Sequence, residues 1–417
     1  MTTEDADDGQ TSSHAGFAAF RHGPYMRYWL ARALAVFAAQ IQIVAVGWQV
    51  YDITRNPLDL GLIGLSQFLP ALLLVLVTGA VADRFSRRGI MAVCLTAEGI
   101  FASGLLAFTI WGGGHIWMVF ALLASFGVAR AFFGPATQAL LPNIVPPKLL
   151  SNAIALNSSA WQLATIVGPV AGGLLYGISP LAAYGSAVGL LLIAAVLTLT
   201  IPKPDQHSEA EPPGWETLVA GFRYIWREKV VFGAISLDLF AVLLGGATAL
   251  LPVYARDILE VGPAGLGFLR AGPGIGAIAV AIWLATHSIR DHAGLWMFLF
   301  VAVFGGMTVV FGASTIVWLS VLALVLMGAA DMVSVYIRET LIQLWTPDRL
   351  RGRVNAVNMV FIGASNELGE FRAGVVAAWL GAKVTVVAGG AGTMAVAAIW
   401  AKLFPALRKA RHLDGRA

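Results

Sequence analysis

Long apolar runs separated by short polar breaks follow one another along almost the whole chain. Most runs reach about 20 residues, the length that an α-helix needs to cross the hydrocarbon core of a bilayer. The breaks are rich in proline, glycine and charge, which favour the ends of helices. This pattern predicts twelve membrane-spanning helices, at 26–51, 58–82, 89–111, 116–141, 152–176, 181–201, 230–254, 266–286, 295–313, 316–337, 354–380 and 384–404.

A polar, proline-rich connector at 202–214 divides these helices into two groups of six. After it, 215–229 alternates aromatic and charged residues at helical spacing, which predicts an amphipathic helix along the membrane surface. The predicted fold is therefore an all-α integral membrane protein of two pseudo-symmetric six-helix bundles. Its expected parts are an N-terminal tail at 1–25, a bundle at 26–201, a linker at 202–229, a bundle at 230–405 and a basic tail at 406–417.

Composition agrees with a membrane protein, since 58% of the 417 residues are hydrophobic and only 12% are charged. A soluble domain carries about twice that charged share. The net charge of +4 does not indicate a nucleic-acid partner, because the basic residues form short clusters between apolar runs. We expect a monomer whose first partner is the lipid bilayer.

The basic residues instead predict the topology. If both termini are cytoplasmic, eighteen of the 27 Lys and Arg residues lie in cytoplasmic segments and only three, Arg55, Arg256 and Lys383, lie outside. Cytoplasmic loops of membrane proteins carry such an excess. We therefore expect a multi-pass protein of a bacterial cytoplasmic membrane with both termini inside.

An internal repeat supports the two-bundle interpretation. Shifting the sequence by 201 residues gives six identities in 28 positions, superposing the fifth helix on the eleventh. Repeats of this kind are typical of transporters, which place a substrate site between two halves that move against each other. The identities align Pro146, Leu149, Ala155, Asn157, Gly168 and Gly173 with Pro347, Leu350, Ala356, Asn358, Gly369 and Gly374.

The turn after the second helix resembles the major facilitator signature G-x-x-x-D-R-x-G-R-R, with Ser86 in place of the second glycine. An acidic residue beside three arginines at a membrane surface can pair with a helix end in one conformation and release it in another. The alternative is that the arginines only orient the protein. The candidate conformational latch consists of Gly79, Asp83, Arg84, Arg87 and Arg88.

The fourth helix carries an R-x-x-x-G element from Arg130 to Gly134, and the fifth resembles the antiporter motif at Gly168, Pro169, Gly172 and Gly173. Glycines at this spacing also permit close helix packing for structural reasons alone. With 129–146 and 346–374, these segments resemble bacterial major facilitators of the enterobactin-exporter type, in the third drug:proton antiporter family. The resemblance implies export of a small organic molecule, such as a siderophore or a toxic amphiphile, in exchange for protons.

In the arrangement that this resemblance implies, helices 1, 4, 7 and 10 line the central cavity, and they carry Arg32, Arg130, Asp238 and Asp331. Ionisable groups within a membrane are costly unless they face a partner or water. Burial disfavours a charged carboxyl and a nearby arginine favours it, so moving an arginine could switch the proton on Asp238 or Asp331. The alternative is a static buried ion pair between the halves.

Helix 11 adds Glu367 and Glu370, which lie three residues apart on one face. They form a second protonation site, or Glu370 pairs with Arg270 of helix 8. Amides and aromatics suit a large amphipathic ligand, although they also join packed membrane helices. The further substrate-cavity candidates are Gln42, Trp48, Gln49, Gln138, Asn157, Trp161, Asn358 and Asn366.

We therefore expect a secondary active transporter that is energised by the proton gradient and needs no cofactor or metal. An importer or lipid-moving facilitator of the same fold is the alternative, and a membrane sensor without transport activity is a third class. An enzyme is not expected, because the chain has no phosphate-binding G-x-x-x-x-G-K-[ST] loop and no H-E-x-x-H pair.

Overall fold

The computed structural model describes residues 18–112, 114–203, 215–287, 289 and 291–410, and these fold into helices without any strand. Most of the predicted tail at 1–25, the connector from 204 to 214 and the last seven residues lie outside this part. The twelve long helical segments are α2 (Gly23–Thr54), α3 (Pro57–Arg84), α4 (Arg87–Ile110), α5 (Trp117–Ile144), α6 (Leu150–Ile178), α7 (Pro180–Leu199), α9 (Lys229–Gly245) with its continuation to Ile258, α11 (Gly262–Thr286), α12 (Ala293–Ala313), α13 (Val317–Trp345), α14 (Asp348–Leu380) and α15 (Ala382–Leu403).

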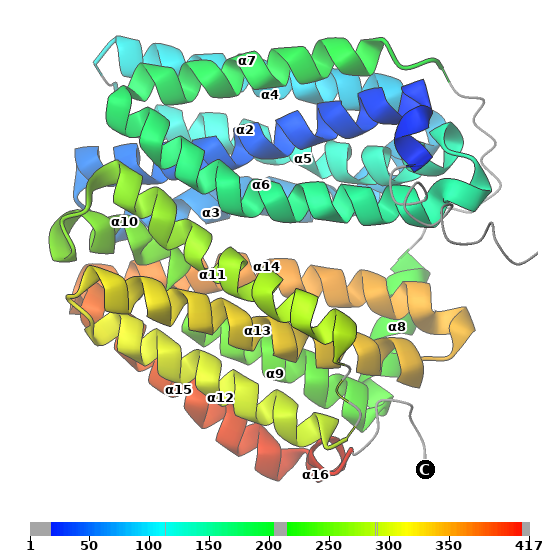
Figure 1. Ribbon diagram of the computed structural model, residues 1–417, viewed down its shortest axis with the longest axis vertical. Helices are drawn as coiled ribbons and strands as arrows, with labels where there is room; N and C mark the ends of the chain where they lie inside the picture. The colour runs from blue at the N-terminus through cyan, green and yellow to red at the C-terminus, as the bar shows by residue number, and fades with distance from the viewer. Residues whose placement is uncertain (1–17, 113, 204–214, 288, 290, 411–417) are drawn as a thin grey trace, which may run out of the picture.

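Eleven of these segments are long and apolar enough to cross a membrane. The twelfth, α14, has 33 residues but is more polar, because Glu367, Glu370 and Arg372 interrupt its apolar sequence. It nevertheless lies in the bundle beside α3 and α9 (Figure 1). The predicted all-α membrane fold with twelve helices is thus confirmed, and the most polar helix is held inside it.

The helices form two groups, α2–α7 and α9–α15, which lie one above the other in Figure 1. The short helices η1 (Ala18–Arg21) and α16 (Pro405–Arg408), near the two chain ends, lie at the same end of both groups. We call this end the terminal face and the other end the distal face. The amphipathic helix α8 (Trp215–Arg227) lies at the terminal face, beside α14.

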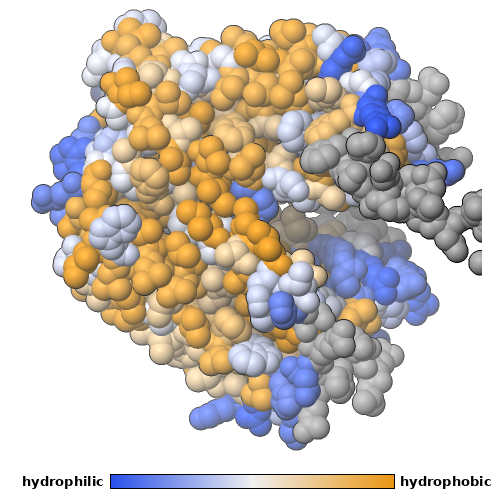
Figure 2. All heavy atoms as spheres, in the orientation of Figure 1, coloured by the Kyte–Doolittle hydropathy of each residue, from blue (hydrophilic) through white to orange (hydrophobic). Residues whose placement is uncertain are grey.

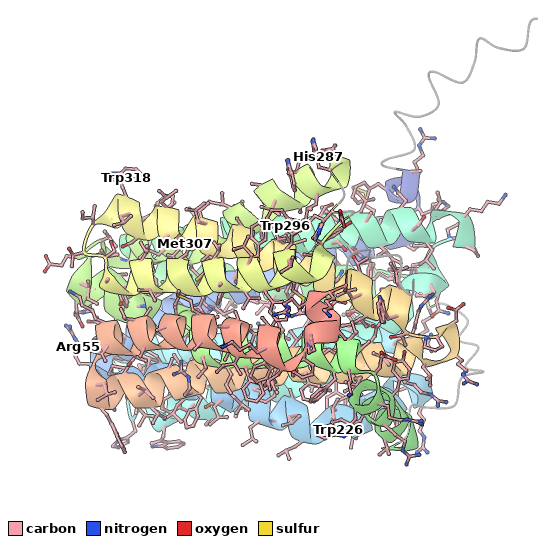
Figure 3. The ribbon with its side chains drawn as sticks, turned by 90° about the horizontal axis from the view of Figure 1, so that it is seen from below. Arg55, Trp226, His287, Trp296, Met307 and Trp318 are labelled. Carbon is pink, nitrogen blue, oxygen red and sulfur yellow. The ribbon has the colours of Figure 1, made fainter. Side chains whose placement is uncertain are left out.

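Exposed tryptophans mark both ends of the apolar surface. Trp318 is 82% exposed near the distal face and Trp226 is 64% exposed near the terminal face (Figure 3). Tryptophan is enriched where a membrane meets water, because its ring is apolar and its N–H is polar. Between these ends the visible surface is mostly hydrophobic (Figure 2), as expected for contact with lipid.

Glycines bring the two halves into contact near the distal face. A Cβ at Gly173 of α6 would lie 2.4 Å from the Pro263 carbonyl oxygen of α11, and a Cβ at Gly374 of α14 would lie 2.8 Å from the Pro57 carbonyl oxygen of α3. Gly173 and Gly374 are equivalent in the 201-residue repeat, and so are the helices that they contact. The repeat therefore encodes two equivalent seams, where only glycine lets the backbones approach so closely.

The antiporter-like motif lies in one of these seams and also packs inside its own half. A Cβ at Gly168 would lie 2.5 Å from Cβ of Gln40, and one at Gly172 would lie 2.9 Å from Cα of Ile41, both in α2. The Pro169 carbonyl oxygen lies 2.4 Å from the position of a Cβ at Gly267 in α11. The motif therefore serves close packing of α6 on both neighbours.

Helices α3 and α14, which meet near the distal face, diverge towards the terminal face. Near the terminal ends of α3 and α14, a Cβ at Gly79 or Gly352 would meet no atom within 4 Å. Figure 2 shows the surface hollowed between the halves at this end, with hydrophilic residues inside the hollow. The molecule is therefore closed at the distal face and open at the terminal face.

The seventh span departs from the sequence prediction of one continuous helix. α9 ends at Gly245, and the chain continues as η3 (Thr248–Leu250), α10 (Leu251–Val253) and the π-helix η4 (Tyr254–Ile258). Gly246 lies at the break, where a Cβ would come 2.9 Å from the backbone of Gly369 in α14. Apolar composition does not reveal such a break, because the broken backbone is buried among other helices.

Candidate functional site

A cavity of about 280 Å³ lies where the two halves meet. The N-terminal half contributes Arg130 from α5 and Gln67 from α3, and the C-terminal half contributes Arg270 from α11 with Glu367 and Glu370 from α14. Four charged side chains thus gather in a region built otherwise from apolar helices. We call this the central cavity.

The two carboxylates of the central cavity reach across to the opposite half. A Cβ on Gly64 of α3 would lie 2.5 Å from Oε2 of Glu367 and 3.4 Å from Oε2 of Glu370. Gly64 therefore provides the space that both carboxylates occupy. Glu370 also accepts a hydrogen bond of 3.0 Å from the Thr248 hydroxyl, at the break in the seventh span.

Two arginines flank these carboxylates, one from each half. Arg130 donates a hydrogen bond of 3.4 Å to Gln67 Oε1. Glu367 lies close enough to interact electrostatically with Glu370, Arg270 and Arg130. Arginine keeps its charge in proteins, whereas a carboxyl can gain a proton. The only charge in this cavity that protonation can change is therefore that of the two glutamates.

A second, smaller cavity of about 160 Å³ lies beside the helix break. Asp331 of α13, Asn366 and Glu370 of α14, and Gly246 and Thr248 of the break line it. Glu370 lines both cavities and so connects them. Because α13 continues eight residues beyond its predicted end at Ile337, Asp331 lies about 21 Å from the terminal end of its helix, deeper than the sequence indicated.

The broken end of α9 is held by Arg372 of α14. Its Nε donates to the Leu243 carbonyl at 2.8 Å and its Nη2 donates to the Leu244 carbonyl at 2.6 Å. Carbonyl groups at the end of a helix lack partners within the helix and carry partial negative charge. Arg372 satisfies both needs, which explains a charged residue at this depth without a role in transport.

Asp238 forms an ion pair with a partner that the sequence analysis did not identify. Its carboxylate contacts the Arg338 guanidinium of α13, and their side chains are only 13% and 4% exposed. Arg130 and Arg32, the arginines expected to serve Asp238 and Asp331, lie in the other half. The observed pair joins two helices of the C-terminal half, and Asp238 does not line either cavity.

Arg32 also does not line these cavities. It lies in α2 close enough to Tyr25 and Tyr28 to interact with them electrostatically. Tyr28 donates a hydrogen bond of 2.9 Å to the Thr137 carbonyl of α5. The surroundings of Arg32 are therefore those of helix packing within the N-terminal half.

The amide and aromatic candidates separate into packing residues and accessible residues. Gln49 binds Thr109 and Tyr184, and thus joins α2, α4 and α7. Asn358 donates to Glu339 at 2.9 Å. Gln42, Trp48 and Asn157 are buried, whereas Gln138, Trp161 and Asn366 are exposed. Among these candidates, only Asn366 lines one of the two charged cavities.

The latch segment connects helices of its own half. Arg87 donates to Asn143 Oδ1 at 2.7 Å and to the Ala139 carbonyl at 3.1 Å, while Arg88 donates to the Ile201 carbonyl. Arg84 is exposed, and the side chain of Asp83 lies outside the described part of the structure. Ser86, the departure from the signature, caps α4 by accepting a hydrogen bond of 3.2 Å from Gly89 N.

The distal face carries a charged cluster that the sequence analysis missed. Asp52 pairs with Arg256, and Arg55 pairs with Asp257 at 3.2 Å. Tyr51 donates a hydrogen bond to Asp257. Each pair joins the end of α2 in one half to η4 in the other, and Arg55 lies at the distal end of the molecule in Figure 3. We call these residues the distal clamp.

The repeat held the signal for this clamp. Shifting by 201 residues places Arg55 on Arg256, so each half contributes one arginine at the equivalent position. Each arginine pairs with an aspartate of the other half. Arg256 also lies 5.4 Å above the ring of Trp48, a cation–π contact. The clamp is thus a pseudo-symmetric lock on the closed face.

We expect the variant Arg55→Gln/Arg256→Gln to open the distal face more often. Partly exposed ion pairs contribute about 0.2–1 kcal/mol each, so losing two shifts the equilibrium by roughly 2- to 30-fold. The measurement is the distance between spin labels at Ile53→Cys and Val384→Cys in a Cys94→Ser background. Lys383→Gln, which removes a charge from the same face, is the control. An unchanged distance distribution would show that the glycine seams alone hold the face closed.

Comparisons with known proteins agree with this architecture. The family model described as transmembrane secretion effector, within the major facilitator superfamily, matches residues 14–416. An enterobactin exporter, EntS, of Escherichia coli O1:K1 / APEC is 26% identical over 380 residues, covering 88% of this chain and 87% of its own.

Solved structures show the same fold at low sequence identity. A bacterial homologue of the human lysosomal transporter Spinster, in an inward-facing and occupied conformation, has a TM-score of 0.75 and 13% identity, covering 93% of this chain and 98% of its own. The nucleoside transporter NupG has a TM-score of 0.71 and 15% identity, covering 91% of this chain and 99% of its own.

Proposed function

Because the chain belongs to the transmembrane secretion effector family of major facilitator transporters, we propose that it exports a small organic molecule in exchange for protons. The observation that carries this proposal is the central cavity. It lies between two halves that are closed on one face and open on the other, and it holds ionisable groups from both. This is the position at which transporters with repeated halves bind their substrates.

The terminal face is the cytoplasmic face in this proposal. It carries the loops with the excess of lysine and arginine, including the arginines at the start of α4 and the basic residues of α8 and α14. The open hollow then gives access from the cytoplasm, from which an exporter takes its substrate.

Exchange requires that the substrate and the proton compete for the same groups. In this proposal, donor groups of the substrate bind the ionised carboxylates of Glu367 and Glu370, between Arg130 and Arg270. When these carboxyls take up protons they lose their charge and bind such donors more weakly, so the substrate is released. Protonation also weakens the attraction of Glu367 for Arg130 in the other half, which eases movement between the halves.

The binding energy of the distal clamp and the glycine seams sets the resting conformation. A conformational change needs an equal difference in affinity of substrate or proton between the two states. The central cavity supplies this difference in affinity, because its carboxylates come from α14 and lie against α3. The contact between α3 and α14 is one of the two seams that must separate.

Transport in vesicles tests the proposal. Inside-out vesicles containing the purified protein, with the lumen made acidic, should accumulate a substrate drawn from a panel of siderophores and amphiphilic amines, and a protonophore should collapse the accumulation. Vesicles without protein are the control. Accumulation that does not depend on the proton gradient would contradict proton coupling. Movement of substrate out of the lumen together with protons would indicate an importer.

A further inference from the structure

Helix α8 presents a shallow, open groove at the terminal face. Its lining consists of Val219, Phe222, Arg223, Trp226 and Arg227. Each of these positions has another of the set three or four residues away, one turn along the helix, so they share one side of α8. Two guanidinium groups and two aromatic rings therefore lie together on a surface that no described helix covers.

The opposite side of α8 is fixed to the C-terminal half. A Cβ at Gly221 would lie 2.6 Å from the Arg353 carbonyl oxygen of α14, and Tyr224 donates a hydrogen bond of 2.7 Å to the Trp345 carbonyl of α13. Ile225 is 2% exposed in a core that includes Val231 and Val354. The exposed groove is therefore held rigidly.

The aromatic rings of the groove are arranged together. Phe222 and Trp226 are stacked with centroids 6.1 Å apart, and they are 47% and 64% exposed. Phe222 also stacks on Phe361 of α14, at 6.4 Å. Figure 3 places Trp226 at the outer edge of the molecule near the terminal face. Tryptophan is enriched where lipid headgroups meet acyl chains, and several spanning helices end near this face.

We propose that this groove binds an anionic phospholipid of the leaflet at the terminal face. The phosphate lies between Arg223 and Arg227, because arginine binds phosphate oxygens through its planar fork of donors. An acyl chain lies on Phe222 and Trp226, whose exposed rings would otherwise contact water. The charge of the two arginines selects an anionic lipid over a zwitterionic one.

The position of the groove gives this lipid a consequence for transport. α8 is packed on the terminal part of α14, the helix that also carries Glu367 and Glu370 of the central cavity. A lipid that holds α8 at the membrane surface therefore restrains the movement of α14, and with it the position of the two glutamates. The lipid site itself does not depend on what the protein transports.

Thermal unfolding of the full-length protein in detergent micelles tests the site. Added phosphatidylglycerol should raise the melting temperature with a half-maximal concentration well below that of phosphatidylcholine. Each basic residue contributes about fivefold to binding at an anionic membrane surface, so Arg223→Gln/Arg227→Gln should raise the half-maximal concentration for phosphatidylglycerol by about 25-fold. Phosphatidylcholine should act equally on both proteins.

A matched control is the variant Arg21→Gln/Lys148→Gln, which removes two exposed positive charges from the same face of the other half. It should keep the response of the unmodified protein. Inorganic phosphate and glycerophosphoglycerol, which lack acyl chains, should have no effect at the same concentrations. An equal loss in the control variant, or stabilisation by the free phosphates, would overturn the proposal.

Discussion

Replacing Arg338 with glutamine is expected to lower the free energy of unfolding by about 3–5 kcal/mol, because it leaves the carboxylate of Asp238 buried without a partner. The two side chains are 4% and 13% exposed, so water replaces little of the lost interaction. Equilibrium unfolding in mixed micelles with increasing SDS fraction measures this change. Arg351→Gln removes an exposed arginine from its pair with Asp348 in α14, and it should cost less than about 1 kcal/mol.

The double variant Asp238→Asn/Arg338→Gln separates the two roles that the sequence left open for Asp238. If the pair is structural, removing both charges should recover most of the stability and retain proton-driven transport, since position 238 no longer carries a buried charge without its partner. A stable double variant that has lost proton coupling would instead show that Asp238 takes part in the proton switch.

The second large effect is expected at the central cavity. Glu367→Gln/Glu370→Gln should lower proton-driven accumulation by at least about tenfold, a loss of roughly 1.4 kcal/mol or more. Exchange of substrate without a gradient should continue only at higher substrate concentrations, because the neutral side chains bind the substrate as weakly as the protonated carboxyls do. Glutamine has nearly the shape of glutamate and still accepts hydrogen bonds, such as that from Thr248 to position 370, but it cannot take up a proton.

The pH dependence of substrate binding shows whether protonation of Glu367 and Glu370 weakens substrate binding, as the proposal requires. In the unmodified protein, affinity without a gradient should weaken as the pH falls, because protonation removes the charges that hold the substrate. In the double variant the affinity should not change with pH. Glu228→Gln, at the start of α9 and outside both cavities, is the control. A double variant that still accumulates substrate uphill would assign the coupling to other groups.

The local sequence determines much of the fold. A spanning helix depends on a run of apolar residues of sufficient length, so most of the twelve segments could be predicted within a few residues of their ends. The polar terminal ends of α13 and α14 extend eight and six residues beyond their predicted bounds. Even α14 was predicted, although its charges exclude it from the eleven helices that are apolar enough by composition. The pattern of apolar runs predicted it at 354–380, and the 201-residue repeat supported that prediction, since Gly369 and Gly374 align with Gly168 and Gly173.

The break in the seventh span could not be predicted in this way. The segment around Gly245 and Gly246 is as apolar as an unbroken helix, and glycine pairs also occur within packed membrane helices. What permits the break is the Arg372 guanidinium, which satisfies the freed carbonyls of Leu243 and Leu244 from a helix more than 100 residues away. An unsatisfied backbone in the membrane would otherwise be too costly.

The sequence by itself determined the number of the spanning segments, their division into two equivalent halves and the glycines at the seams, because each follows from local hydropathy or from the repeat. Only the tertiary structure decided which charges meet. Asp238 could be listed as a charge in the membrane, but its choice of Arg338 depends on how α9 and α13 pack. Glu367 and Glu370 likewise lie between Arg130 and Arg270 because Gly64 leaves space for them on α3. Electrostatic pairing depends on distance in space, which separation along the chain does not reveal.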